Sequence, residues 1–238
     1  MILYLGDDTI YGAAAYLCGV MKCHGIPFER VDSGVSPTSI FGYDAYILSD
    51  YPASGFQPGQ MEAIRDAVAE GSGLAMFGGW ESFHGRFGEY HRSPLVDVLP
   101  VKMFNEDDRC NFSQPLMIQH CRNHPILDGL PWNTPPFIGG FNRFEPKPNA
   151  EVLLETVRFD VQLGETLTLT TPERFPLLVV GKHGKGNVAA LATDVAPHWI
   201  GGWVDWGKER ITQSTVDDGF IEVGADYAKF FARLVQWL

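Results

Sequence analysis

The sequence has few basic residues and no long apolar run. Lysine and arginine number 18 against 29 aspartates and glutamates, which gives the 238-residue chain a formal charge of −11. A negative field repels polyanions, so this balance disfavours binding to nucleic acid or to an anionic membrane. The apolar start, residues 1–5, runs straight into Gly6-Asp7-Asp8 and is too short for a signal peptide or a membrane span. We therefore expect a cytoplasmic protein with neither nucleic acid nor membrane among its partners.

Cysteine is scarce and shows no metal-binding pattern. The four thiols form no Cys-x-x-Cys pair and no zinc-ribbon spacing, and the seven histidines include no His-Glu-x-x-His motif. The sequence therefore predicts no metal site. We expect reduced thiols, buried as small hydrophobes, at Cys18, Cys23, Cys110 and Cys121.

Apolar residues make up 45% of the chain, enough for a sizeable core, and the length fits one domain over residues 1–238. The first 85 residues alternate between short apolar runs and segments with helical spacing, which favours a doubly wound sheet with right-handed crossovers. The predicted strands are 1–5, 28–31, 43–50 and 74–77. The predicted helices carry Ala14, Leu17, Cys18 and Met21, and then Met61, Ile64 and Val68.

The second half of the chain has a different residue pattern. Short β-branched or aromatic segments are separated by proline, glycine and asparagine, as in antiparallel additions. Residues 176–181 and 188–194 are predicted to form a hairpin within the core sheet, and a helix with apolar positions from Tyr227 to Leu238 closes the chain. The fold class is thus α/β, with a mostly parallel sheet that holds Leu3, Ile47, Met76 and Leu191 on adjacent strands.

Polar residues follow several predicted strands, where the carboxyl ends of an open α/β sheet form ligand sites. They are Asp7 and Asp8, Asp50, Gly79 to Ser82, and Asp194 to Trp199. Each has a structural alternative. Asp7 or Asp8 could cap the next helix, and Asp50 could start a turn. Asp194 could bond its own loop amides while Trp199 is core.

The turn Gly78-Gly79-Trp80-Glu81-Ser82 is the most informative local feature. A buried strand that enters a helix through adjacent glycines is typical of a nucleophile elbow, but the nucleophile position here holds Trp80. The alternative is a tight turn in which the glycines are needed only because a side chain would not fit there. Residues 181–186 lack the Gly-Lys-Ser/Thr of a phosphate loop, and no Gly-x-Gly-x-x-Gly follows the first strand. No cofactor is expected.

Several stretches together resemble the class I glutamine amidotransferase-like proteins, relatives of the ThuA-like group. The resemblance covers most of the chain and is carried by residues 74–85, 94–101, 124–130, 184–188 and 194–199. It implies a flavodoxin-like sheet with the pocket over the elbow. Members with glutaminase activity use an elbow cysteine with a histidine and a glutamate. Here Trp80 replaces that cysteine and His198 would pair with Asp194, so we predict no glutaminase activity.

The leading hypothesis is a protein that binds a small polar ligand, with sugars or other polyhydroxylated molecules as the expected class. The candidate catalytic residues are Glu81, His198 and Asp194. The candidate ligand-binding residues are Asp7, Asp8, Gly79, Trp80, Ser82, His84 and Trp199. One alternative is a hydrolase or lyase that uses Glu81 or His198 as general acid or base. Another is an assembly module, a homo-oligomer with exposed Trp203 and Trp206 at its interface.

Overall fold

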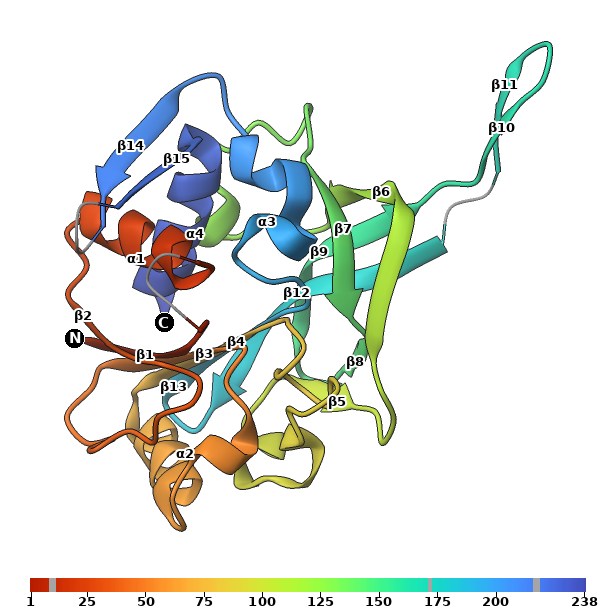
Figure 1. Ribbon diagram of the computed structural model, residues 1–238. Coiled ribbons are helices and arrows are strands. Elements are labelled where there is room, and N and C mark those ends of the chain that lie inside the picture. Colours follow the sequence, from red (N-terminus) through yellow and green to blue (C-terminus); the bar gives the residue numbers. More distant parts are fainter. Residues whose placement is uncertain (9–11, 171–172, 216–218) are drawn as a thin grey trace.

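The computed structural model describes residues 1–8, 12–170, 173–215 and 219–238. Nine strands form one sheet in the order β2-β1-β3-β4-β13-β12-β9-β6-β7 (Figure 1). Their bounds are β1 Ile2–Gly6, β2 Phe28–Val31, β3 Ala45–Ser49, β4 Gly73–Phe77, β6 Arg109–His120, β7 Phe137–Asn142, β9 Glu151–Arg158, β12 Glu173–His183 and β13 Gly186–Leu191. The main helices are α1 Ala14–Cys23, α2 Gln60–Glu70, α3 Pro197–Ile200 and α4 Ala225–Trp237.

Strands β2, β1, β3, β4 and β13 pair in parallel and form one half of the sheet. Leu3, Ile47, Met76 and Leu191 lie on its adjacent strands β1, β3, β4 and β13, as predicted. Every residue of β1, β3 and β4 is buried, because helices cover both faces. Figure 1 shows α1 and α4 on one face and α2 on the other.

The other half is antiparallel and confirms the predicted additions. Strand β12 pairs with β13 through the expected hairpin, and β9, β6 and β7 follow outward. Three small ribbons complete the chain: β5 Val101–Met103 with β8 Phe144–Pro146, β10 Val161–Leu163 with β11 Leu167–Leu169, and β14 Arg210–Ser214 with β15 Phe220–Gly224.

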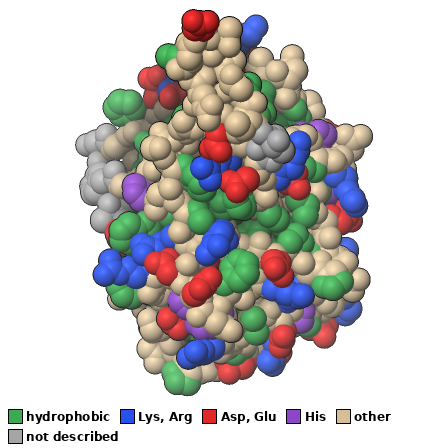
Figure 2. All heavy atoms as spheres, turned by 90° about the vertical axis from the view of Figure 1, so that its right-hand side faces the viewer, with side chains coloured by type: hydrophobic (Ala, Val, Ile, Leu, Met, Phe, Trp, Pro, Cys, Tyr) green, Lys and Arg blue, Asp and Glu red, His purple; other side chains and the backbone are tan. Residues whose placement is uncertain are grey.

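The β10–β11 ribbon projects away from the body (Figure 1). Its strands pair Val161 with Leu169 and Leu163 with Leu167, so four apolar side chains share one exposed face. Figure 2 looks onto this side of the molecule, where hydrophobic side chains gather near the centre among interspersed acidic and basic ones.

No helix follows β4, contrary to the expected strand-to-helix elbow. The chain runs through turns and bends from residue 78 to 89, and two short 3-10 helices, Tyr90–Arg92 and Pro94–Val96, follow. Phe83 and Glu89 have left-handed backbones, with φ of 53° and 58°, which no continuous α-helix accommodates. Trp80 is not among the left-handed residues, so the strained backbone of a nucleophile elbow is absent at this position.

Two further expectations were wrong. Trp203 and Trp206 are buried rather than exposed, because they pack with each other and Trp203 also contacts Phe230 of α4. They belong to the core, so the exposed tryptophan pair on which the interface hypothesis was based is not present. The four cysteines are free, but only Cys18 is buried; Cys110 is half-buried, and Cys23 and Cys121 are exposed at the ends of α1 and β6. Within the described chain, no helix is long and apolar enough to cross a membrane.

Candidate functional site

Strands β1 and β3 end in aspartates at the same edge of the sheet. Asp7 and Asp50 both adopt left-handed backbones, with φ of 52° and 47°. Aspartate tolerates this conformation better than most residues, yet it remains uncommon and clusters at functional sites. The strands approach closely here, since a Cβ at Gly6 would lie 1.7 Å from the carbonyl oxygen of Ser49. The turn after each strand therefore places a carboxylate above the sheet.

A cavity of about 390 Å³ lies above these strand ends, and we call it the strand-end cavity. It is lined by four acidic side chains together with Trp80, Phe87, Ala13 and His198; the acidic ones are Asp7, Asp8, Asp50 and Glu81. None of the described residues that line it is a lysine or an arginine. The described residues contain no group of three histidine, cysteine or acidic side chains arranged to hold a metal ion.

Burial controls the protonation of the cavity carboxyls. Burial first, and the Asp50 carboxylate second, raise the pKa of Asp7 to about 7. The Tyr4 hydroxyl donates to Asp7 and opposes this shift. Burial also raises the pKa of Asp50 to about 6, although the backbone amides of Glu81 and Trp80 lower it. For Glu81, burial and then Asp50 raise the pKa. The carboxyl groups of Asp7 and Asp50 can thus each gain or lose a proton near neutral pH.

Asp194 lies beneath the cavity rather than in its lining. Its carboxylate accepts hydrogen bonds from the backbone amides of Trp199, at 3.1 Å, and Ile200, at 2.9 Å. Burial raises the pKa of Asp194 well above its ordinary range. The His198 Nδ1 atom is 3.9 Å from Asp194 Oδ2. Asp194 therefore bonds the amides of its own loop, as in the structural alternative considered from the sequence. The His198 side chain itself lines the cavity.

Trp80 forms a wall of the cavity and is 40% exposed. Its ring centroid lies 6.4 Å from that of His198, so one small ligand can touch both side chains. The Arg109 guanidinium lies 4.4 Å from the centroid of the Trp80 ring. The indole thus has a cation on one side and an imidazole close by.

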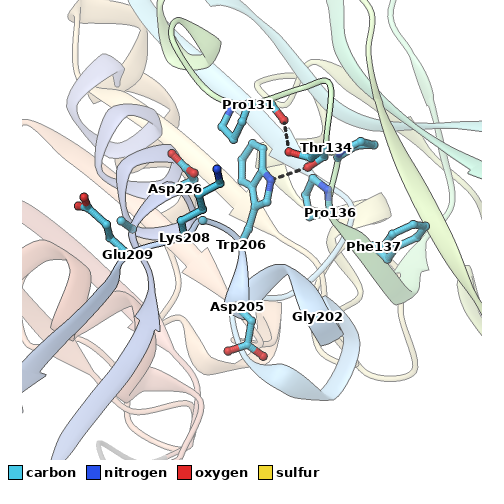
Figure 3. Close-up of a pocket in the computed structure, with 13 residues that line it drawn as sticks. Pro131, Thr134, Pro136, Phe137, Gly202, Asp205, Trp206, Lys208, Glu209 and Asp226 are labelled. Carbon is cyan, nitrogen blue, oxygen red and sulfur yellow. Dashed lines mark hydrogen bonds between the residues drawn. The ribbon is translucent and has the colours of Figure 1, made fainter.

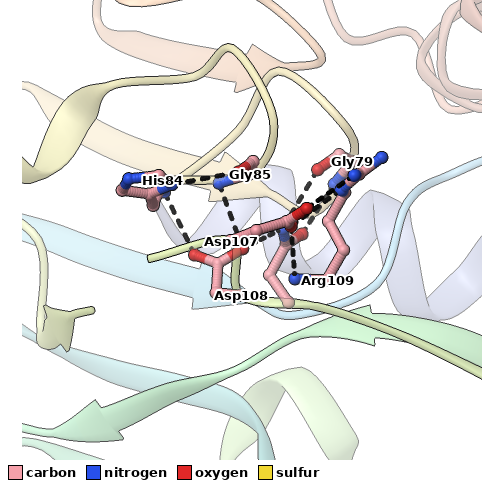
Figure 4. Close-up of polar contacts among 7 residues, drawn as sticks. Gly79, His84, Gly85, Asp107, Asp108 and Arg109 are labelled. Carbon is pink, nitrogen blue, oxygen red and sulfur yellow. Dashed lines mark hydrogen bonds and ion pairs between the residues drawn. The ribbon is translucent and has the colours of Figure 1, made fainter. Parts of the chain in front are cut away.

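The loop that carries Trp80 is held from below by two fully buried side chains, Asn142 and Asp108. Asn142 accepts a 2.8 Å hydrogen bond from the Gly79 amide and donates a 3.0 Å one to the Gly79 carbonyl. Asp108 accepts hydrogen bonds from the amides of His84 and Gly85, both at 3.1 Å (Figure 4). Side chains of the antiparallel half therefore replace the helical partners that the loop amides lack.

Five sequence-predicted residues come together in the strand-end cavity: Asp7, Asp8, Trp80, Glu81 and His198. Others serve the framework. Ser82 is buried and accepts from the Asp50 amide, and Trp199 is buried with its indole N–H donating to Asn111. The ring of His84 lies against that of His91, with the ring centroids 4.4 Å apart and the planes tilted by 34°. Gly79 lies in the clamp of Asn142, where a Cβ would lie 1.9 Å from Asp50 Oδ1.

Sequence reasoning missed Ala13 and Phe87, and it named Asp50 as a strand-end candidate without including it among the predicted catalytic or ligand-binding residues. Asp50 follows a buried strand in the way Asp7 does, and this position was a usable signal. Phe87 lies ten residues beyond the end of β4, and only the folded loop brings it back to the cavity.

A second pocket of about 540 Å³ shares no residue with the strand-end cavity. Trp206 lies at its centre and donates a 2.9 Å hydrogen bond from its indole to the Thr134 carbonyl (Figure 3). Pro131 and Pro136 flank the indole, and Lys208, Glu209 and Asp226 stand at one side. None of the predicted site residues belongs to it.

A family model described as "Putative glutamine amidotransferase" matches residues 38–213, well over half of the chain. The chain belongs to this glutamine amidotransferase-like family. The match spans the loop after β4 and most of the antiparallel half, and it includes Trp80 and His198 of the cavity. A comparison with curated protein sequences finds no match.

Solved structures of this glutamine amidotransferase-like fold agree in architecture. Cytoplasmic protein STM3548 from Salmonella typhimurium is 22% identical with a TM-score of 0.77, over 100% of this chain and 98% of that one. Cytoplasmic protein STM1381 from Salmonella typhimurium LT2 is 24% identical with a TM-score of 0.75, over 99% and 98%. A ThuA-like protein from Parabacteroides merdae is 13% identical with a TM-score of 0.56, over 99% and 88%. Similarity at this level shows the shared fold.

Proposed function

We propose that this cytoplasmic protein binds a small polyhydroxylated molecule, such as a sugar, in the strand-end cavity and has no glutaminase activity. The observation that carries the proposal is the combination of an exposed indole with several carboxyl groups in one cavity. The flat face of Trp80 suits the C–H face of a sugar ring. The carboxyls of Asp8, Asp50 and Glu81 offer acceptors for hydroxyl groups, and ionised acceptors form strong hydrogen bonds.

The same loop supports the proposed lack of glutaminase activity. Covalent hydrolysis of glutamine needs a thiolate at the end of β4. The chain has Trp80 there, on a backbone that is not the strained elbow. The four cysteines lie elsewhere, at the ends of α1 and β6, inside α1 and near the start of β6.

The test is a binding screen by thermal shift and titration calorimetry. The probes are glucose, galactose, their amino and N-acetyl derivatives, and linear polyols. We expect at least one saturable interaction that Trp80→Ala weakens by about tenfold or more, equivalent to ~1.4 kcal/mol. Phe41→Ala is the matched control, because Phe41 is 76% exposed and lies outside the cavity lining. Failure of every probe to bind, or equal loss in both variants, would overturn the proposal.

A second candidate is acid–base catalysis as a hydrolase or lyase. It is favoured by the pKa of Asp7, raised to about 7, and of Asp50, raised to about 6, since a general acid or base works best when it titrates near the ambient pH. Glu81 and His198 line the same cavity and would contact the substrate. Turnover of a bound sugar derivative that is lost in Glu81→Gln or His198→Ala, with unchanged circular dichroism, would establish catalysis. Binding without turnover would leave the binding function alone.

A further inference from the structure

Three consecutive residues at the start of β6 face the loop that carries Trp80. Side chains alternate along an extended chain, so Asp107 and Arg109 point to one side and Asp108 to the other. Asp108 is fully buried and bonds the loop amides (Figure 4), whereas Asp107 is exposed and the Arg109 side chain is 16% exposed. One short segment of the antiparallel half therefore contacts the loop both from below and from the side.

Arg109 is held in one orientation by Asp107. Its Nε atom donates to Asp107 Oδ1 at 2.8 Å, and its terminal nitrogen donates to Asp107 Oδ2 at 2.6 Å. This two-pronged contact is the geometry in which arginine and a carboxylate pair most strongly. It lowers the pKa of Asp107, which keeps the carboxylate ionised. The guanidinium is thereby fixed rather than free to sample many rotamers.

The fixed guanidinium stacks on Trp80. Its central carbon lies 4.4 Å from the indole centroid, within the range of a cation–π contact. Trp80 lines the strand-end cavity and Arg109 does not. The guanidinium therefore contacts the indole without itself lining the cavity.

We propose that Arg109, oriented by Asp107, is a positioning residue that fixes the Trp80 indole as one wall of the ligand site. The role of this contact in ligand binding rests on the proposed function, but the orientation of the indole is a property of the protein without ligand. Backbone bonds at Gly79, His84 and Gly85 fix the loop, yet they leave the Trp80 side chain free to rotate. The stacked guanidinium removes that freedom. The alternative is that the Asp107–Arg109 pair only stabilises the start of β6.

The experiment observes Trp80 directly, by ¹⁹F NMR of protein labelled with 5-fluorotryptophan. The chain has six tryptophans, and the resonance missing in Trp80→Phe assigns Trp80. The test variants are Arg109→Ala, Asp107→Asn and Arg109→Lys. Arg158→Ala is the matched control, because Arg158 also pairs with a carboxylate, Glu173 at 2.9 Å, and lies over another aromatic ring, Phe112 at 5.7 Å.

Arg109→Ala should move the Trp80 resonance toward its position in the urea-unfolded protein while the other five resonances stay in place. Acrylamide quenching of Trp80, taken as the difference between each protein and its Trp80→Phe counterpart, should rise, because loss of one exposed cation–π contact changes the side-chain populations by about 2- to 5-fold. Asp107→Asn should give a smaller change in the same direction, and Arg109→Lys should restore part of the wild-type signal. The control should leave Trp80 unchanged.

An unmoved Trp80 resonance in folded Arg109→Ala would overturn the proposal, as would an equal shift in Arg158→Ala. These measurements need no ligand, so they stand even if every sugar probe fails to bind. If a probe does bind, Arg109→Ala should weaken it by about 2- to 5-fold as well. Unchanged affinity together with a mobile indole would refute the link to binding and leave the stacking as local structure.

Discussion

Asn142 donates a 2.7 Å hydrogen bond to Asp108, and both side chains are fully buried beneath the Trp80 loop. Asn142 ends β7 and Asp108 precedes β6, so the two lie on neighbouring strands of the antiparallel half. Each also bonds the backbone of the loop. A buried polar pair of this kind is stable only while every member is satisfied.

Asn142→Ala should destabilise the protein and loosen the loop. The substitution leaves the Gly79 amide and carbonyl and one Asp108 oxygen without this partner, and each buried unsatisfied group costs ~1–3 kcal/mol. We expect a loss of roughly 2–4 kcal/mol in the free energy of unfolding by urea titration. Asn149→Ala is the control, because Asn149 is exposed on the same half of the sheet. Equal stability of the two variants would show that the hydrogen bonds of Asn142 contribute little to the free energy of unfolding.

Asp7 should make stability fall as pH rises. The unfolded carboxyl titrates near pH ~3.9, whereas burial and the Asp50 carboxylate raise the folded pKa to about 7. Between these values the folded state binds more protons than the unfolded state, so the free energy of unfolding decreases as pH rises and levels off above pH ~7. Asp7→Asn removes this buried charge, and asparagine also tolerates the left-handed backbone.

The variant should therefore be more stable than wild type at pH 8, by on the order of 2–4 kcal/mol, and lose that advantage near pH 4. Urea titrations at a series of pH values measure the difference. Asp66→Asn, which removes an exposed carboxylate on α2, is the control. A pH-independent difference for Asp7→Asn would mean that Asp7 is ionised without cost in the folded protein.

Asp194 should act first as a cap of α3. Asp194→Ala removes the acceptor for the amides of Trp199 and Ile200, and a lost cap costs ~0.5–2 kcal/mol. Asp194→Asn retains one carbonyl oxygen and should lose less. Thermal unfolding compares both with Asp205→Ala, an exposed residue nearby. If Asp194→Ala instead kept full stability but lost ligand binding, the cap would be secondary to a direct role in the site.

The protein should not release ammonia from glutamine, and Trp80→Cys should not create that activity. A thiol at position 80 would still lack the elbow backbone and an oxyanion hole, whose loss alone costs ~10²–10³ in rate. A coupled ammonia assay against a buffer blank is the measurement. Ammonia production by the wild-type chain would contradict the assignment, and production by Trp80→Cys would show that the loop can adopt the elbow.

Most of the parallel half could be predicted from sequence because β1, β3 and β4 are short, almost wholly apolar runs that end at or just before a glycine or an aspartate. Strand β2 occupies the predicted residues, and the placement of Asp7, Trp80 and His198 in one cavity follows from the rule that parallel strands share a carboxyl edge. The sequence pattern was sufficient wherever residues close together in the chain determine the local structure.

The rest depends on contacts between distant residues. The loop after β4 has the glycines of an elbow, but Asp108 supplies acceptors that a helix would otherwise provide, and nothing near Gly79 in the sequence announces it. Trp203 and Trp206 have glycines and polar residues around them in the sequence. No pattern near them therefore predicts that they are buried, Trp203 against Phe230 of α4. The same holds for Arg109, whose role depends on a ring twenty-nine positions away.

Strands β4 and β13 are neighbours in the sheet, although residues 78–185 separate them in the chain. A ribosome therefore delivers β1 to β4 long before β13 exists. During that interval the nascent chain presents the apolar edge of β4, Gly73–Phe77, without its partner, and an uncovered strand edge invites pairing with other chains. His198 emerges later still, so the strand-end cavity can form only after β13 and the residues that follow it have been synthesised. Chaperone demand should accordingly peak while the antiparallel half is being translated.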